Sequence, residues 1–416
     1  MGVRYSLYDY GIQQDPYPVY TQLREEAPVH RNDEEDFWVL SRHEDVTAAF
    51  RDFRRFSSAN GILLEPSVWG PQARRHASFL ALDPPEHTRM RGLVAKALTP
   101  RRVADLEPRI RDIARGHLDR ALDGAEFDLV ADYAAPLPMD VISELLGVPE
   151  VDRGELRRLA DPIVHHQQGL QDVTRACHEA IPVLAGHFHD LIAERRARRR
   201  DDLVSALLYA AEGGDHLTEA EIIGVLLVLV AAGTGTATNL ISNAWHCAWR
   251  HLDRPSAAFG RVGDWIEETL RLEAPAQADG RTVTGEFTLH GVTVPAGARV
   301  LLVLGAANRD PRVFRDPDRF DLGRDTTAKI SFGSGRHYCI GANLARLEAR
   351  IALEELAARV GDYAIDEARA RRLASPYVRG FAELPTTAVP TADRWPRSAA
   401  IMSTLRGPRA SNRHGA

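Results

Sequence analysis

The sequence predicts a mainly α-helical protein with a small β region. From about Asp45 to Leu272, apolar residues recur with the period of an α-helix, for example at Val103, Leu106 and Ile110. Alternating apolar residues, which are typical of strands, are confined to short runs outside this stretch. The chain has 416 residues, 44% of them hydrophobic and 26% charged, so it can bury a large core and fold compactly in water.

Short alternating runs predict two hairpins and one further strand. Residues 28–30 and 37–40 flank an acidic turn near the N-terminus and are expected to pair. Residues 287–289 and 292–294 flank a turn that contains glycine, so they form the second expected hairpin. A proline and glycine turn then leads into an expected strand at residues 300–304.

A long irregular stretch separates the β region from the last expected helix. Residues 308–341 are rich in turn residues, and Leu344, Leu347 and Ile351 then indicate a helix. An irregular stretch of this length inside a compact protein needs a functional reason. Breaks in the earlier helical part are expected at residues 84–85, 136–138, 149 and 213–214.

We expect one domain over residues 1–392. The sequence contains no internal repeat, and the stretch from 393 to 416 is rich in Arg, Ser, Gly and Ala without periodicity. This C-terminal tail is therefore expected to be disordered.

Composition argues against several classes of protein. The 58 acidic and 52 basic side chains give a formal net charge of −6, so the chain lacks the strongly basic surface of a nucleic-acid binder. Cys177, Cys247 and Cys339 are far apart and odd in number, which argues against a disulfide framework or a zinc site and fits a reducing cytoplasm. The longest apolar run, residues 222–233, is shorter than the about 20 residues that span a bilayer. We expect a cytoplasmic protein without a membrane anchor.

The most specific motif places a cysteine in a glycine-containing loop just before a helix. Residues 332–341 read F-G-S-G-R-H-Y-C-I-G, with Cys339 as the cysteine. A reactive thiolate needs backbone N–H donors and a nearby helix N-terminus to stay anionic, and glycines let the backbone fold closely around it. A lone cysteine is otherwise a small buried apolar residue, which is the interpretation we give to Cys177 and Cys247.

This loop resembles the haem-binding loop of the cytochrome P450 family, F-G-x-G-x-[HR]-x-C-x-G, and it matches every defined position. The resemblance implies the P450 fold, haem b (iron protoporphyrin IX) as cofactor and Cys339 as the axial ligand of the iron. A thiolate ligand favours cleavage of the O–O bond, so the iron would activate O2. Phe332, Gly333, Gly335 and Gly341 would shape the loop.

A second resemblance joins two further segments. Glu268 and Arg271 match the family's E-x-x-R motif and are spaced to lie on one helix face. Taken alone, such a pair is most often a surface contact that contributes about 0–1 kcal/mol. Its place upstream of the cysteine loop, with P-D-R-F at residues 317–320 between the two, implies that Glu268, Arg271 and Arg319 form a buried structural network.

The apolar helix that begins near Glu221 carries a third resemblance. Residues 231–238 read A-A-G-T-G-T-A-T and are similar to the family's oxygen-groove motif, A-G-x-[DE]-T. Gly233 would open the helix surface for O2, and the hydroxyl of Thr236 would hold a water that delivers protons. Thr236 could instead bond to its own helix. Gly235 departs from the motif because it stands where the family has an acid, which puts the usual proton relay in doubt.

Basic residues match the family's contacts with the haem propionates. His87 and Arg91 lie at i and i+4 after the prolines at 84–85, so they share a helix face. The alternative is a solvated basic face of the helix. By resemblance, His87, Arg91, Arg281 and His337 bind the propionates.

The resemblance covers residues from about 15 to 385 and implies a monooxygenase that inserts one oxygen atom from O2 into a small or medium organic substrate, with hydroxylation as the default reaction. The Arg- and Ala-rich composition is typical of actinomycete proteins and suggests a secondary metabolite as substrate. Residues 57–82 and 161–182 are the expected specificity loops. Gly235 keeps two alternatives open, which are oxidative coupling or ring closure without oxygen insertion and a haem-thiolate binding or sensing protein without turnover.

The chain has no length left for a fused reductase, so electrons are expected from separate proteins. The resemblance implies a ferredoxin and an NAD(P)H-dependent ferredoxin reductase, with NAD(P)H acting only through these partners. Arg336, Arg346 and Arg350 could receive an acidic ferredoxin. We expect a monomer that binds a small-molecule substrate and neither nucleic acid nor membrane.

Overall fold

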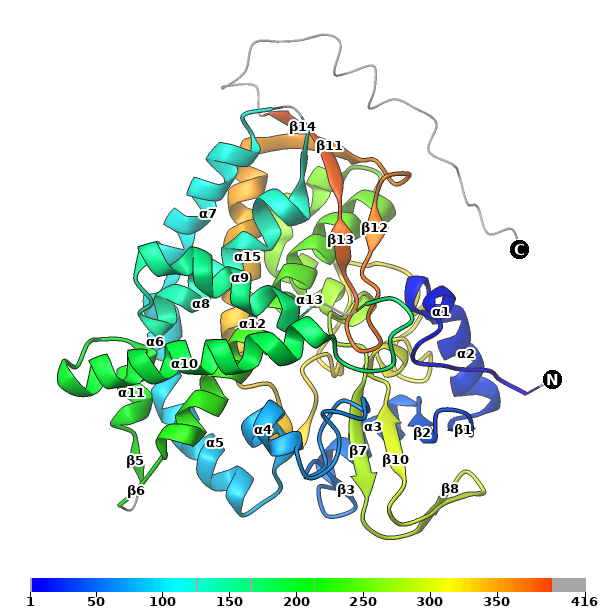
Figure 1. Cartoon of the computed structure of the whole chain (residues 1–416). Coiled ribbons are helices and arrows are strands. Elements are labelled where there is room, and N and C mark those ends of the chain that lie inside the picture. The colour runs from blue at the N-terminus through cyan, green and yellow to red at the C-terminus, as the bar shows by residue number, and fades with distance from the viewer. Residues whose placement is uncertain (1, 125, 165–166, 213, 391–416) are drawn as a thin grey trace.

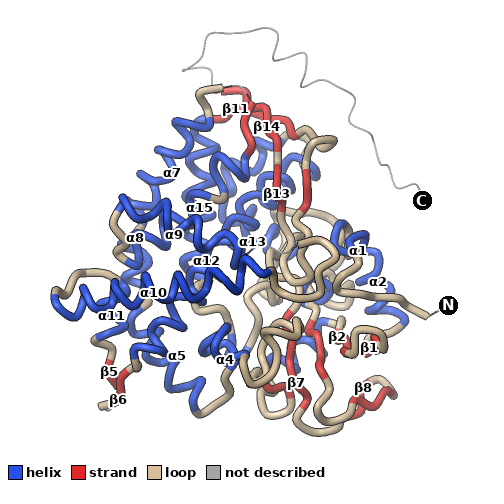
Figure 2. The backbone as a smooth tube through the Cα atoms, in the orientation of Figure 1, coloured by secondary structure: helices blue, strands red, loops and turns tan. Residues whose placement is uncertain are grey.

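Helices make up most of the molecule, and the strands gather at its margins (Figures 1 and 2). The computed structural model describes residues 2–124, 126–164, 167–212 and 214–390, so the predicted disordered tail 393–416 lies outside the described residues. The predicted mainly α class with a small β region is confirmed. The helices are α1 (Tyr10–Gln14), α2 (Tyr17–Glu26), α3 (His43–Arg51), α4 (Ala73–Ala77), α5 (Glu86–Ala97), α6 (Pro100–Asp105), α7 (Glu107–Ala121), α8 (Pro136–Leu146), α9 (Arg153–Val164), α10 (Arg175–Ala197), α11 (Leu203–Leu208), α12 (Glu219–His251), α13 (Val262–Leu272), α14 (Leu304–Ala307) and α15 (Ala342–Arg359).

The helical breaks follow the prolines and glycines that predict them. Helix α5 begins directly after Pro84 and Pro85, and Pro149 separates α8 from the next helical turn. The break predicted at residues 136–138 is confirmed, because η2 (Val130–Ala134) ends before it and the prolines form the first turn of α8, where backbone N–H groups have no partner within the helix. The shorter helical pieces are η1 (Ser78–Ala81), the π-helical turn η2 (Val130–Ala134), η3 (Glu150–Asp152), η4 (Pro255–Arg261) and η5 (Gly335–His337).

The strands confirm both predicted hairpins and the strand after them, and the first hairpin and that strand belong to the largest sheet. Its order is β1-β2-β10-β7-β3, with β10 parallel to β2 and the other pairs antiparallel. Strand β8 pairs with β9 as a separate hairpin. The strands of this region are β1 (Val29–Asn32), β2 (Phe37–Leu40), β3 (Phe56–Ser57), β7 (Asp279–Val283), β8 (Phe287–Leu289), β9 (Val292–Val294) and β10 (Arg299–Leu302).

A second sheet was not predicted from the sequence. Strand β14 lies between β11 and β4, so it joins the C-terminal part of the described chain to a segment more than 250 residues earlier. Its sequence, P-T-T-A-V-P, contains two prolines, which are rare inside a paired strand and hide it from pattern analysis. The remaining strands are β4 (Glu126–Asp128), β5 (Ala211–Glu212), β6 (Asp215–His216), β11 (Val360–Ile365), β12 (Arg371–Arg372), β13 (Phe381–Glu383) and β14 (Pro385–Pro390).

Helix α12 is the central element of the fold (Figure 1). Its first turn is fixed by a capping box, because the Thr218 hydroxyl accepts from the Glu221 N–H and the Glu221 carboxylate accepts from the Thr218 N–H at 2.9 Å. The helix packs against α8, α10, α13 and α15, and most of its apolar residues belong to the largest core cluster.

By length and composition, α12 is also the one helix in the described part of the chain that could cross a membrane, with a mean hydropathy of 1.9 in its most apolar window. The predicted apolar run 222–233 therefore understates the apolar length of this helix. Only 39% of that window is buried, and part of the remainder faces the internal cavity described below. Core helices of soluble proteins pass the same test, so this is weak evidence for a membrane span.

Candidate active site

The cysteine loop has a backbone conformation that requires its glycines. Gly333 and Gly335 have φ angles of +71° and +70°, in the left-handed region that side chains disfavour. A Cβ atom on Gly335 would lie 2.8 Å from the carbonyl oxygen of Phe50, so no larger residue fits there. The Cys339 N–H donates to the Phe332 carbonyl at 2.9 Å and closes the loop. The loop therefore holds Cys339 in one place without regular secondary structure.

The thiol of Cys339 opens onto an internal cavity. The side chain is solvent-accessible and lines the cavity, and helix α15 begins three residues later. Burial within the protein raises the pKa of this thiol, and a backbone hydrogen bond from Gly341 and the charge of Arg91 act in the opposite direction. Cys177 and Cys247 are buried, as expected for small apolar residues.

The cavity has a volume of about 690 Å³ and a largely apolar lining. Helices α8 and α12, the cysteine loop, and residues from the segments 61–80, 275–279 and 373–382 contribute side chains to it. The predicted specificity loop 57–82 supplies several of these, whereas 161–182 supplies Asp161 and Ile163. Such a volume is in the usual range for small-molecule sites of roughly 300–1,000 Å³.

Helix α12 presents Gly233, Gly235 and Thr236 to the same cavity that Cys339 lines. The Thr236 hydroxyl donates to the Ala232 carbonyl at 2.7 Å, so the back-bonded alternative is the one observed. A hydroxyl that donates once keeps its lone pairs, and these remain able to accept a hydrogen bond. A Cβ atom on Gly233 would meet the Ile142 side chain at 3.8 Å, an ordinary van der Waals contact, so the glycine leaves room for about one methyl group at the cavity wall.

Two histidines, one buried and one half-buried, lie with their rings tilted against each other beside the cavity. The rings of His87, on α5, and His337, in η5, are 4.0 Å apart. Both ring nitrogens of His87 and Nε2 of His337 are buried and find no hydrogen-bond partner among the described residues. Burial lowers the pKa of His87 to about 4 and that of His337 to about 2. Buried ring nitrogens without partners are costly, so this arrangement suits a bound group that supplies acceptors.

Arg91 and Arg281 flank the two histidines. The Arg91 guanidinium donates to the Tyr338 carbonyl and lines the cavity with His337, whereas His87 and Arg281 are not among the lining residues. Arg281, on β7, is buried and donates to the Gly280 carbonyl at 2.6 Å, and burial lowers its pKa. Buried cations need anionic partners. The four predicted propionate ligands thus lie in surroundings that fit the carboxylates of a haem.

The Glu268–Arg271 pair is fully buried behind the cysteine loop. Two guanidinium nitrogens of Arg271 donate to the two Glu268 carboxylate oxygens at 2.8 Å each, a bidentate geometry. Arg271 also donates to the carbonyls of Asn308, Pro317 and Arg319. These contacts fix the irregular stretch that leads to Cys339.

The prediction that the Arg319 side chain completes this network is wrong. Arg319 is exposed and contributes only its backbone carbonyl, which accepts from Arg271 and Arg324. The Arg324 side chain takes the place instead, with Nε 3.1 Å from a Glu268 oxygen. A loop that turns several times brings residues together in an order that sequence spacing does not reveal, because Arg324 folds back over residues 315–319.

The sequence analysis missed the cavity wall near the C-terminus. Leu373, Tyr377, Val378 and Phe381 line the cavity between β12 and β13. These residues form no periodic pattern. The arginines at 372 and 379, in an otherwise apolar stretch, were the available signal of a buried polar contact.

Comparisons with known proteins agree with this geometry. Residues 263–358 match the family model described as Cytochrome P450. Over 382 residues the chain is 48% identical to the "Putative cytochrome P450 123" of Mycobacterium tuberculosis, an alignment that covers 91% of this chain and 95% of the relative. The chain belongs to the cytochrome P450 family.

Other P450 relatives carry functional names. Over 89% of this chain and 90% of the relative, it is 39% identical to the "Cytochrome P450 monooxygenase PikC" of Streptomyces venezuelae. Over 93% of this chain and 97% of the relative, it is 36% identical to the "Vitamin D(3) 25-hydroxylase" of Pseudonocardia autotrophica. The solved structure of CYP109Q5 from Chondromyces apiculatus has 33% sequence identity and a TM-score of 0.86, covering 94% of this chain and 100% of that one. The chain is thus an oxidoreductase of the monooxygenase type with the P450 fold, in a family that uses haem and O2.

Proposed function

We propose that this P450 hydroxylates a small or medium apolar organic molecule, such as a secondary metabolite, using electrons from a separate ferredoxin and NAD(P)H-dependent ferredoxin reductase. The observation that carries the proposal is the single apolar cavity lined both by the Cys339 thiol and by Gly233, Gly235 and Thr236 of α12. We also propose that residues 1–392 form one domain of a cytoplasmic monomer that binds neither nucleic acid nor membrane.

In this proposal, haem b occupies the part of the cavity beside the cysteine loop. Cys339 ligates the iron, and Phe332, Gly333 and Gly341 surround the thiolate. His87, Arg91, Arg281 and His337 would bind the propionates, which would supply hydrogen-bond partners for the buried ring nitrogens of the two histidines and counter-charges for the two arginines. When bound, haem with a thiolate ligand supplies the activation of O2 and the oxidation of the substrate.

Helix α12 provides the other side of the reaction site. Gly233 lines the cavity without a side chain of its own, and we propose that O2 lies beside it. Thr236 Oγ1 keeps its bond to the Ala232 carbonyl and accepts a hydrogen bond from a water that delivers protons. The apolar lining excludes further water and orients an apolar substrate.

We propose Arg336 as the main contact for an acidic ferredoxin. Of the three predicted arginines, Arg346 is paired with Glu267 at 2.6 Å, and Arg350 with Glu107 at 2.7 Å. Arg336 is exposed, packs on the Phe53 ring at 4.8 Å and has no ion pair within the described ranges. Its charge is therefore the one that remains available to a partner.

Gly235 supports a second candidate function, which is oxidative coupling or ring closure. The family motif has a carboxylate at this position, and a glycine cannot feed protons to Thr236. Slow proton delivery would favour radical recombination on the substrate, in which the cycle ends without oxygen in the product.

Isotopically labelled O2 distinguishes the two functions. The protein, with ferredoxin and reductase, is incubated with NAD(P)H and each substrate that shifts its Soret band. Hydroxylation predicts a product that carries one labelled oxygen atom. A product that has lost two hydrogens and contains no label would support coupling instead, and NAD(P)H consumption without any product would contradict both.

A further inference from the structure

The cavity wall between β12 and β13 has little regular structure of its own. The two strands pair at only two positions, Arg371 with Glu383 and Arg372 with Phe381, and their register shifts between them. Tyr377 and Phe381 nevertheless contribute directly to the cavity. The wall therefore depends on contacts behind it for its position.

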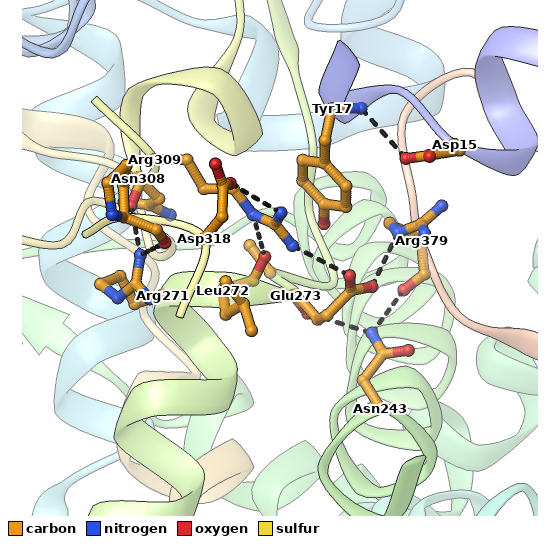
Figure 3. A network of polar contacts seen from close by, with 12 residues as sticks. Asp15, Tyr17, Asn243, Arg271, Leu272, Glu273, Asn308, Arg309, Asp318 and Arg379 are labelled. Atoms are coloured by element: carbon orange, nitrogen blue, oxygen red, sulfur yellow. Dashed lines mark hydrogen bonds and ion pairs between the residues drawn. The ribbon is translucent and has the colours of Figure 1, made fainter. Parts of the chain in front are cut away.

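Glu273 is the buried carboxylate behind this wall (Figure 3). One of its oxygens accepts from Arg379 Nε at 2.7 Å, and the other accepts from Arg309 Nη2 at 3.1 Å. Arg372 Nη1 lies 3.5 Å from the first oxygen. One carboxylate thus joins the end of α13 to both sides of the wall and to the segment after α14.

Backbone contacts around Glu273 extend the connection to other elements. The side-chain amide of Asn243, on α12, donates to the carbonyls of Glu273 at 3.0 Å and Arg379 at 2.9 Å. The Arg379 guanidinium also donates to the carbonyls of Gln13 and Gln14 at the end of α1. The wall is therefore fixed to α12 and to the N-terminal helices through residues that do not line the cavity.

Of the three arginines, Arg372 depends most on Glu273. Arg309 has a second carboxylate partner in Asp318 at 3.1 Å, and Arg379 has the carbonyls of α1. Arg372 has Glu273 as its one ion-pair partner among the described residues, together with a 3.3 Å contact to the Asn243 oxygen. Burial, and then the nearby charge of Arg379, lower the pKa of Arg372 to about 10 although Glu273 opposes this. The guanidinium still carries its charge at neutral pH, but it is less favoured there than in a solvent-exposed arginine.

Arg372 connects this charge cluster to the cavity. Its guanidinium lies over the ring of Phe381 at 3.8 Å from the centroid, a cation–π contact that holds the ring from behind. The ring also contacts His246, on α12, with 4.8 Å between the ring centroids. If Arg372 lost its counter-charge, it would turn toward solvent, because a buried unpaired cation is unfavourable. Phe381 would then lose its cation–π contact with Arg372.

We propose that Glu273 is a positioning residue which, through Arg372 and Phe381, sets the shape of the cavity wall 373–382 and so selects ligands by size without touching them. The test below rests on the proposed haem function, because it reads ligand binding through the iron.

The experiment compares two azole ligands that bind haem iron through the same imidazole nitrogen but differ in bulk. Imidazole reports only on the iron, whereas clotrimazole, with three aromatic rings, must also fit the cavity walls. Both affinities are measured on the holoenzyme from the shift of the Soret band. Glu273→Gln keeps the size of the side chain and removes the charge, and it should weaken clotrimazole binding by about tenfold while imidazole binding changes less than about twofold.

Three further variants separate positioning from general stability. Glu273→Asp keeps the charge and should recover most of the clotrimazole affinity. Glu383→Gln removes a carboxylate from an exposed ion pair of the same hairpin, with Arg371 at 2.7 Å, and should leave the ratio of the two affinities unchanged. Arg372→Met removes the cation directly, keeps an unbranched apolar stem, and should lower the ratio as Glu273→Gln does.

The ratio of the clotrimazole and imidazole affinities in these variants tests the role of Glu273. An unchanged ratio in haem-loaded Glu273→Gln or in Arg372→Met overturns it, and so does an equal effect of Glu383→Gln. If Glu273→Gln fails to load haem, the ratio in Arg372→Met decides alone. A wild-type protein that shows no thiolate-type spectrum with CO is a distinguishable result, because it overturns the proposed function first and this inference with it.

Discussion

The cysteine loop and helix α12 line the same cavity, but they are built in different ways. The loop is irregular, needs glycines with positive φ at two positions and is closed by the bond from Cys339 to Phe332. Helix α12 is a continuous helix in which Thr234, Thr236 and Thr238 each donate to a carbonyl of their own helix. The loop holds the Cys339 thiol in one place, whereas the threonine hydroxyls of the helix can still accept hydrogen bonds.

This difference corresponds to two tasks, which are cofactor binding by the loop and control of the substrate reaction by α12. The cysteine loop matches its family motif at every defined position, since only one backbone path places a thiolate there. Helix α12 departs from its motif at Gly235 without any loss of helical structure. Changes at the loop should therefore abolish cofactor binding, and changes on α12 should alter what happens to the substrate.

The largest effect is expected from Glu268→Ala, which acts on the cysteine loop from behind. The change leaves Arg271 and Arg324 without their shared carboxylate inside the protein. Breaking a buried pair typically costs about 3–5 kcal/mol, so stability and haem content should both fall. Urea unfolding and the ratio of Soret to protein absorbance measure them.

The exposed pair Glu155–Arg158 is the matched control, because it has the same i,i+3 spacing on a helix surface. Glu155→Ala should leave the urea midpoint and the haem content close to those of wild type, because an exposed pair is screened by solvent. Equal effects of the two substitutions would show that burial of the Glu268 pair is unimportant.

A smaller effect, of about tenfold, is expected from Thr236→Ala on the other side of the cavity. Loss of Oγ1 removes the group that holds the proton-delivering water, so reducing equivalents should be released as peroxide. The measurement is product formed per NAD(P)H consumed. Ser242→Ala is the control, since this hydroxyl also bonds to its own helix but does not line the cavity. Equal coupling in wild type and Thr236→Ala would remove Thr236 from the mechanism.

Arg336→Glu should slow electron delivery by roughly threefold to tenfold at low ionic strength, with less effect at high salt, because surface charges are screened. Stopped-flow reduction by ferredoxin under CO measures the rate. Arg350→Glu is the comparison, as Arg350 is already paired with Glu107 and Glu354. A salt-independent rate in both variants would place the ferredoxin elsewhere.

The smallest change is expected from Gly235→Asp, which restores the family's acid. We expect no faster product formation, because the carboxylate would crowd the substrate or the water and would be buried without a cationic partner. Product rates are compared in the reconstituted system. An increase of about tenfold, or ~1.4 kcal/mol of barrier, would mean that the native site simply lacks a proton donor.

The cysteine loop, α15 and the hairpins could be predicted from the sequence because local rules determine them. Glycines, a cysteine before a helix and period-two runs carry their meaning within ten residues. The third member of the Glu268–Arg271 network could not be predicted, since Arg319 and Arg324 both lie in one irregular stretch and only the folded path brings Arg324 to the carboxylate. Sequence spacing could show that the irregular stretch 308–341 supplies the third residue, but not which residue it is.

The β14 strand and the wall 373–382 were missed for a related reason. Strand β14 pairs with β4 across more than 250 residues and begins and ends with proline, so neither propensity nor pattern indicates it. The wall is held by Glu273, which lies about 100 residues earlier in the chain. The arginines at 372 and 379 could indicate a buried polar contact, but nothing in the local sequence identifies Glu273 as their partner.

The central claim is that Cys339 binds the iron of a haem as a thiolate. The most direct test is the absorption spectrum of the reduced protein with CO, recorded for wild type, Cys339→Ser and the control Cys177→Ser. We expect the red-shifted Soret band of thiolate ligation in wild type and in Cys177→Ser. Cys339→Ser should lack this band. Retention of that band in Cys339→Ser would contradict the account.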